Sequence, residues 1–120
     1  MATRAIRGAT QLAEDSESEM ISAVTELLTE IMDRNGLTTD AFISILFTST
    51  PDLVSCFPAK AARKLDLAEV PLMCAQEIPV PGALERVVRI MAHVDTPQER
   101  ADVQHVFLRG AQVLRQDLVR

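Results

Sequence analysis

The stretch SESEMISAVTELLTEIMDRNG (residues 16–36) decides the fold, because it specifies one long helix with a single apolar face. Ser16, followed three residues later by Glu19, matches the pattern of a helix capping box. Apolar residues then recur at helical spacing from Met20 to Met32, and the pair at 35–36, Asn-Gly, is a typical stop. We therefore predict a helix of about five turns that packs one face on the rest of the protein.

Short apolar runs on either side of this helix predict β-strands. The first two run from Thr3 to Thr10, closed by Gly8, and from Phe42 to Thr48. A short helix is expected at 59–65 with Pro58 at its first position. Further strands are expected at 70–78, 87–94, 103–108 and 111–114, with a loop and a helical turn at 95–102. This order predicts an α+β fold with a mixed β-sheet and one long helix, in a single domain spanning residues 1–120.

Composition and charge exclude several classes of protein. A chain of 120 residues with 48% hydrophobic and 24% charged residues is typical of a globular domain. The net charge of −5 and the lack of Tyr and Trp argue against nucleic-acid binding. No apolar run reaches the ~18 residues of a membrane span, and no signal-peptide pattern is present, so we expect a cytoplasmic protein without a membrane partner. Cys56 and Cys74 lack metal-ligand spacing, and we expect free thiols.

Arginine dominates the positive charge, with ten Arg among the twelve cationic residues. Arg7, Arg89 and Arg115 interrupt apolar stretches, where a cation is costly unless an anion meets it. The planar guanidinium matches a carboxylate in two-point contact. The pattern indicates a pocket for a small anion with more than one carboxylate. The alternative is a set of ion pairs with the chain's own Asp and Glu.

The predicted strand at 87–94 has two unlike faces. Its even-numbered residues, from Val88 to Val94, are all apolar, whereas its odd-numbered positions place Arg89 beside Met91 and His93. Because side chains alternate along a strand, one face is expected to meet the core and the other to line a site.

Several stretches of the chain fit one pattern when they are taken together. They are Arg4–Thr10, Thr50–Leu53, Phe57–Arg63, Val70–Glu77, Arg89 in its strand, His105–Leu108 and Val113–Leu118. Together they resemble the monofunctional chorismate mutases of the trimeric, barrel-like class, and the resemblance covers nearly the whole chain in the right order.

The resemblance implies a homotrimer whose sheets pack into a pseudo-α/β barrel, with three active sites in the clefts between subunits. The reaction would be the Claisen rearrangement of chorismate to prephenate in phenylalanine and tyrosine biosynthesis, with no metal and no organic cofactor. Chorismate carries two carboxylates, which suits recognition by arginine. Since the rearrangement is unimolecular and transfers no proton, catalysis would come from holding the reactive conformer and stabilising separated charge.

The resemblance also implies residue roles. Arg89 would donate to the breaking ether oxygen and to a carboxylate, Arg7 would bind a carboxylate, and Glu77 would meet the ring hydroxyl. Four further contacts would come from the neighbouring subunit: Phe57, Ala59, Lys60 and Arg63. The remaining substrate contacts would be Met73, Cys74, Phe107, Leu114 and Arg115.

Some of these residues also have a purely structural explanation. Arg63 could offset the dipole at a helix C-terminus, Cys74 could be a small buried filler, and Glu77 could pair with a local Arg. Strict alternation also places Cys74 and Glu77 on opposite faces of one strand. His93 and His105 are expected to be packed or hydrogen-bonded residues rather than catalysts.

Two departures from the family pattern stand out. Phe107 occupies a position where the family usually has Tyr, and Gln116 replaces a customary Pro. Two other functions stay open, a non-catalytic trimeric sensor of a small dicarboxylate on the same scaffold and a small trimeric deaminase. The combination of Arg7, Glu77 and Arg89 favours the mutase over both.

Overall fold

A five-stranded mixed β-sheet forms the framework, as the sequence predicts. The computed structural model describes residues 1–114 and orders the strands β3-β2-β4-β1-β5. The strands are β1 (Ala2–Gln11), β2 (Phe42–Ser49), β3 (Leu72–Gln76), β4 (Val87–Thr96) and β5 (Val106–Phe107). Strand β4 runs antiparallel to both of its neighbours, β1 and β2, whereas β3 runs parallel to β2 and β5 runs parallel to β1.

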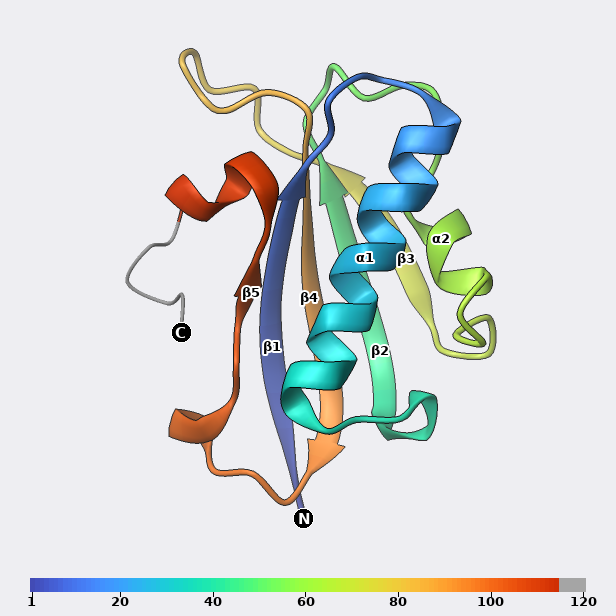
Figure 1. Ribbon diagram of the computed structural model, residues 1–120, viewed down its shortest axis with the longest axis vertical. Helices are drawn as coiled ribbons and strands as arrows, with labels where there is room; N and C mark the ends of the chain where they lie inside the picture. Colours follow the sequence, from blue (N-terminus) through green and yellow to red (C-terminus); the bar gives the residue numbers. More distant parts are fainter. Residues whose placement is uncertain (115–120) are drawn as a thin grey trace.

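Two α-helices, α1 (Glu17–Asn35) and α2 (Ala59–Arg63), lie on one face of the sheet (Figure 1). Three short 3₁₀ helices complete the described part: Thr39–Ala41, Arg100–Asp102 and Arg109–Val113. The predicted long helix, the short helix after Pro58 and the helical turn in the 95–102 loop are confirmed.

Helix α1 begins and ends at the residues that the sequence indicated. The Ser16 hydroxyl accepts the Glu19 N–H at 3.2 Å, and Gly36 ends the helix with φ 62°, in the left-handed region. The Glu19 carboxylate does not close the capping box on Ser16, however, because it accepts the Ala13 N–H at 3.1 Å. Glu19 thus ties the helix start to the connection that follows β1.

The core lies between the sheet and the helices. The side chains that α1 contributes are almost fully enclosed: Met20, Ala23, Val24, Leu27, Leu28 and Ile31. The even-numbered residues of β4 face them, from Val88 to Val94, all exposed by 3% or less. Burial of each large side chain of this kind contributes about 1.5–3 kcal/mol, which fixes α1 on this face of the sheet.

Strand β1 continues through Gly8 to Gln11, so the prediction that Gly8 closes this strand is wrong. A Cβ at position 8 would come within 2.9 Å of Ile31 Cδ1 and 3.3 Å of Leu27 Cδ1. Glycine therefore lets α1 pack this closely on the strand, because a Cβ would force the end of the Ile31 side chain to shift.

The strands predicted at 70–78 and 103–108 are shorter than expected. Strand β3 begins at Leu72, because the preceding Pro71 has no N–H to donate to a ladder. Before β5, the Gln104 N–H donates to Asn35 Oδ1 at 2.8 Å, and its carbonyl accepts from Asn35 Nδ2 at 2.9 Å. The side chain of Asn35 thus occupies the backbone groups that a longer strand would pair.

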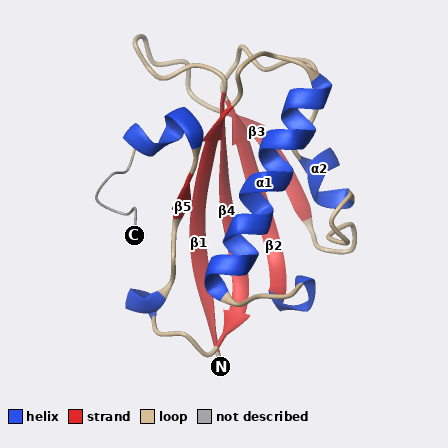
Figure 2. Cartoon of the chain, in the orientation of Figure 1, coloured by secondary structure: helices blue, strands red, loops and turns tan. Residues whose placement is uncertain are grey.

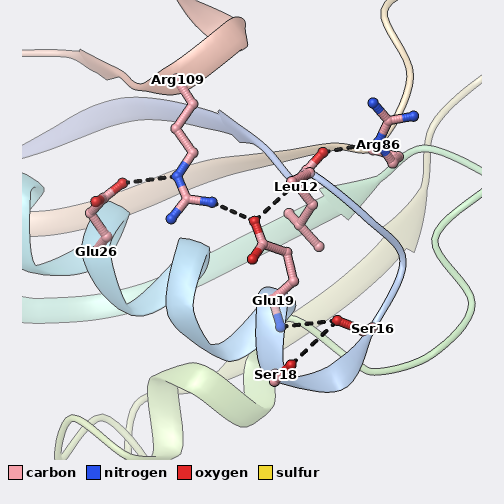
Figure 3. Close-up of polar contacts among 8 residues, drawn as sticks. Leu12, Ser16, Ser18, Glu19, Glu26, Arg86 and Arg109 are labelled. Atoms are coloured by element: carbon pink, nitrogen blue, oxygen red, sulfur yellow. Dashed lines mark hydrogen bonds and ion pairs between the residues drawn. The ribbon is translucent and has the colours of Figure 1, made fainter.

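The strand predicted at 111–114 is wrong, because a 3₁₀ helix occupies Arg109–Val113. Arg109 has φ 53°, in the left-handed region, and turns the chain immediately after β5. Its guanidinium anchors the turn to α1, donating to Glu19 Oε1 at 2.6 Å and to Glu26 Oε1 at 3.2 Å (Figure 3). Ion pairs between residues so far apart in the sequence cannot be predicted from the local sequence pattern.

The opposite face of the sheet is open at its centre. Both α-helices of the described residues lie on the other side (Figure 2), and Leu46 and Met73 on the open face are 40% and 62% exposed. Arg7, Thr48 and Arg89 lie on this open face.

Candidate active site

Strand pairing brings arginines from β1 and β4 together on the open face. Arg89 is flanked in its row by Ala9 of β1 and Thr48 of β2, and the next row places Arg7 beside Met91. Arg7 and Arg89 are therefore diagonal neighbours, at a separation across which long side chains can cooperate. The prediction that the odd-numbered face of the 87–94 strand lines a site agrees with this arrangement.

A hollow of about 410 Å³ opens between these side chains, lined in part by Arg7, Thr48, Arg89 and Phe107. Ala9, which is paired with both Arg89 and Phe107, is buried and is not among the lining residues. The volume falls in the range of about 300–1,000 Å³ that is usual for small-molecule pockets.

Glu77 joins this group from just beyond the last residue of β3. Its backbone N–H donates to Ser49 O at 2.9 Å, and its Oε2 accepts from Arg89 Nε at 3.1 Å and from Thr48 Oγ1 at 2.7 Å. Glu77 does pair with an arginine, as the structural alternative proposed, but the partner is Arg89 itself. The ion pair and the candidate site are therefore the same group of residues.

The ion pair leaves part of Arg89 available for a ligand. Only Nε bonds to Glu77, and within residues 1–114 the two terminal nitrogens make no hydrogen bond. The Arg89 side chain is 43% exposed, against 18% for Glu77. A guanidinium held by Nε presents its Nη pair as a fork, which suits two-point contact with a carboxylate or another anionic oxygen.

Other predicted site residues lie on the same face but contribute differently. Met73 is paired with Leu46. Leu46 lines the hollow, but Met73 does not. The Phe107 ring is 4% exposed and packs with Ala9 and Ala111, with the half-buried Leu114 against this small cluster. Phe107 thus forms a fixed wall at the β1 edge of the hollow.

Cys74 and Phe57 lie elsewhere. Cys74 is paired with Phe47 and packs half-buried against the main core, as the small-filler explanation expected. Both residues line a second hollow, of about 470 Å³, beside the loop before α2. Within one chain, the structure does not bring them to Arg7 and Arg89. Cys56 lines this second hollow too, and burial, followed by the charge of Glu17, raises the pKa of its thiol.

The α2 residues predicted to come from a neighbouring subunit are also remote from the first hollow. Ala59 is buried, whereas Lys60 and Arg63 are exposed. Lys60 donates to Glu17 Oε1, and this hydrogen bond raises the pKa of Lys60 and lowers that of the Glu17 carboxyl. Arg63 is the last residue of α2, a position that also fits the helix-dipole explanation.

Both histidines serve as hydrogen-bonding residues, as expected. His105 Nδ1 accepts the Arg7 N–H at 3.0 Å, and His93 Nδ1 lies 3.1 Å from the Ser44 hydroxyl. Among residues 1–114, no three His, Cys, Asp or Glu side chains are grouped so that they could hold a metal ion. Arg115 lies outside the described residues, as does Gln116.

Among the residues that line the hollow, sequence reasoning missed Leu46 and Thr48 of β2. Leu46 and Thr48 belong to an apolar run that was interpreted as a buried strand. Alternation within that run was the available signal, but the exposed face becomes known only once β2 is placed beside β4.

Comparison with known proteins decides the family. A family model described as chorismate mutase type I matches residues 3–118. The chain belongs to the type I chorismate mutase family. It is 46% identical over 118 residues to the chorismate mutase AroH of Thermus thermophilus, covering 96% of this chain and 95% of that protein. The corresponding protein of Bacillus subtilis (strain 168) is 39% identical over 119 residues, covering 98% and 94%.

A solved chorismate mutase structure from Clostridium thermocellum has the same fold. It aligns with a TM-score of 0.89 at 46% identity, over 91% of this chain and 97% of that one. The predicted chorismate mutase is thus confirmed at the level of family and fold, and the sensor and deaminase alternatives are not favoured. None of the helices within residues 1–114 has the length and apolar character needed to span a membrane.

Proposed function

We propose that this chorismate mutase converts chorismate to prephenate on the open face of its sheet, with Arg7, Glu77 and Arg89 as the catalytic group. The two arginines bind carboxylates of the substrate and hold its reactive conformer. Arg89 also donates from its Nη fork to the ether oxygen, on which negative charge builds as the C–O bond breaks. Glu77 accepts from the ring hydroxyl through Oε1, the oxygen that Arg89 and Thr48 leave open.

One observation carries this proposal: the single-point Arg89 Nε contact with Glu77, which orients the guanidinium and leaves its fork open. A preorganised donor to a developing oxyanion is worth about 2.7–4 kcal/mol in the transition state. Binding the reactive conformer adds to this stabilisation, and no acid–base step is required because the reaction transfers no proton.

The complete site is proposed to form between subunits of a homotrimer. Two features of the chain support this. The open face exposes apolar side chains such as Leu46 and Met73, which a neighbouring sheet would cover. Phe57, exposed by 73%, and the exposed cations Lys60 and Arg63 lie away from the hollow of their own chain, so a neighbour's copies could complete it. A location in the cytoplasm stays a prediction from the sequence.

The activity is tested directly by incubating the purified protein with chorismate and following prephenate. The shared site is tested by complementation between Arg63→Ala and Arg89→Ala. Each variant alone should have very low activity. When they are unfolded and refolded together, hybrid trimers should form in which some clefts receive both intact arginines, and activity should reappear.

Refolding each variant alone is the control, and exchange is verified with a mass-tagged subunit. Complete subunit exchange without any gain in activity would place both arginines in the site of one chain. If the protein is a monomer at the concentration used in the activity assay, the proposed trimer is wrong.

A further inference from the structure

Thr48 occupies a central place in the candidate site. On the open face it is paired with Arg89 of β4 on one side and with Ala75 of β3 on the other. It therefore stands between the strand that carries Arg89 and the strand that ends just before Glu77. It also lines the hollow that holds Arg7 and Arg89.

The Thr48 hydroxyl and Arg89 share one oxygen of Glu77. The hydroxyl donates to Oε2 at 2.7 Å, the length of a good charge-assisted bond, while Arg89 Nε reaches the same oxygen at 3.1 Å. Two donors on Oε2 fix the plane of the carboxylate. The other oxygen, Oε1, then has a defined direction in which to accept a substrate hydroxyl.

Without the hydroxyl, Glu77 and Arg89 would have a competing arrangement. A free carboxylate and guanidinium favour two-point contact, which would consume an Nη group of Arg89. Glu77 lies beyond the end of the edge strand β3, and among the described residues its side chain bonds only to Thr48 and Arg89. The hydroxyl thus opposes rotation of the carboxylate into the fork that the substrate needs.

We propose that Thr48 is a positioning residue, which holds Glu77 so that Arg89 keeps its Nη fork and Glu77 keeps Oε1 for the substrate. The proposal rests on the roles given above to Glu77 and Arg89. Thr48 acts through Glu77 and needs no direct contact with chorismate.

The test compares Thr48→Val, which keeps shape and β-branching, with Thr48→Ser, which keeps the hydroxyl. Thr48→Val should lower kcat/KM about tenfold, the lower end of what one hydrogen bond to a charged group contributes. KM should rise at least as much as kcat falls, because the competing Glu77–Arg89 contact must break before substrate binds. Thr48→Ser should restore most of the loss, and Thr48→Ala gives a second hydroxyl-free variant.

Thr3→Val is the matched control. Thr3 Oγ1 also donates to a strand carboxylate, Asp95 Oδ1 at 3.2 Å, but on residues outside the Arg89 hollow. Removing the hydroxyl of Thr3 should leave kcat/KM within about twofold of the wild-type value.

A Glu77→Ala background separates positioning from packing. If Thr48 acts through Glu77, Thr48→Val should have almost no further effect in that background. An equal tenfold loss there, or wild-type kcat/KM in both Thr48→Val and Thr48→Ala, would overturn the proposal. Failure of the proposed function would look different, since the wild type would then be inactive or Arg89→Ala would keep its activity.

Discussion

Replacing Arg89 with lysine keeps one positive charge but removes the fork on which the proposed chemistry depends. In the structure, Nε serves Glu77 at 3.1 Å and the two Nη groups stay open. A lysine ammonium has one nitrogen in place of three, and Glu77 Oε2 is the nearest anion to attract it. The variant therefore retains the ion pair with Glu77 and loses the donor to the ether oxygen.

The expected loss follows from that single donor. About 2.7–4 kcal/mol of transition-state stabilisation corresponds to a fall of roughly 100- to 1,000-fold in kcat. Steady-state kinetics of chorismate consumption measure it, with circular dichroism to verify the fold. Arg34→Lys, at an exposed i,i+4 ion pair on α1, is the control and should behave as wild type. An Arg89→Lys enzyme with near wild-type kcat would show that Arg89 does not act on the breaking bond.

Three further outcomes are expected. Phe107→Tyr should lower KM about threefold to tenfold by adding a donor to a substrate carboxylate, and an unchanged KM would show that the new hydroxyl points elsewhere. Between about pH 6 and 8, kcat should vary little and show almost no solvent deuterium effect, whereas a bell-shaped profile traced to His93 or His105 would contradict a reaction without proton transfer. Arg109→Gly should be more stable than Arg109→Ala by about 1 kcal/mol in thermal unfolding, because both lose the ion pairs but only glycine accepts φ 53° without strain; equal stabilities would show that the backbone relaxes.

The parts of the fold that depend on residues close together in the sequence could be predicted. The cap at Ser16, the stop at Gly36 and the alternation along β4 all act within a few residues, and all were predicted. The chain after β5 could not be predicted in this way. Asn35 shortens β5 across a long sequence separation, and the left-handed Arg109 is anchored to α1, so apolar residues that suggested a strand form a 3₁₀ helix.

The candidate site, too, could be predicted only in part from the sequence. Family resemblance pointed to Arg7, Glu77 and Arg89, and the structure places them on one face. The role of Thr48 could not be predicted, because it depends on strand register: a shift of one residue would turn its hydroxyl toward the core. Phe57 and Cys74 were assigned to the same site, yet one chain holds them in a separate hollow. Their assignment therefore depends on assembly, which the sequence of one subunit does not encode locally.

The position of β1 in the sheet, between β4 and β5, has a consequence for synthesis of the protein. Strand β1, the first of the five strands in chain order, pairs with β4 from Ala2 opposite Thr96 to Gln11 opposite Val87, so its main partner is made much later. At about 5–20 residues per second, β1 waits roughly 5–20 s for that partner. During this interval α1 can form by local contacts, but the β1–β4 ladder that makes Arg7 and Arg89 diagonal neighbours cannot. The proposed site is thus among the last features that a nascent chain forms, and truncated chains ending before residue 87 are expected to leave β1 without β4 and available to chaperones.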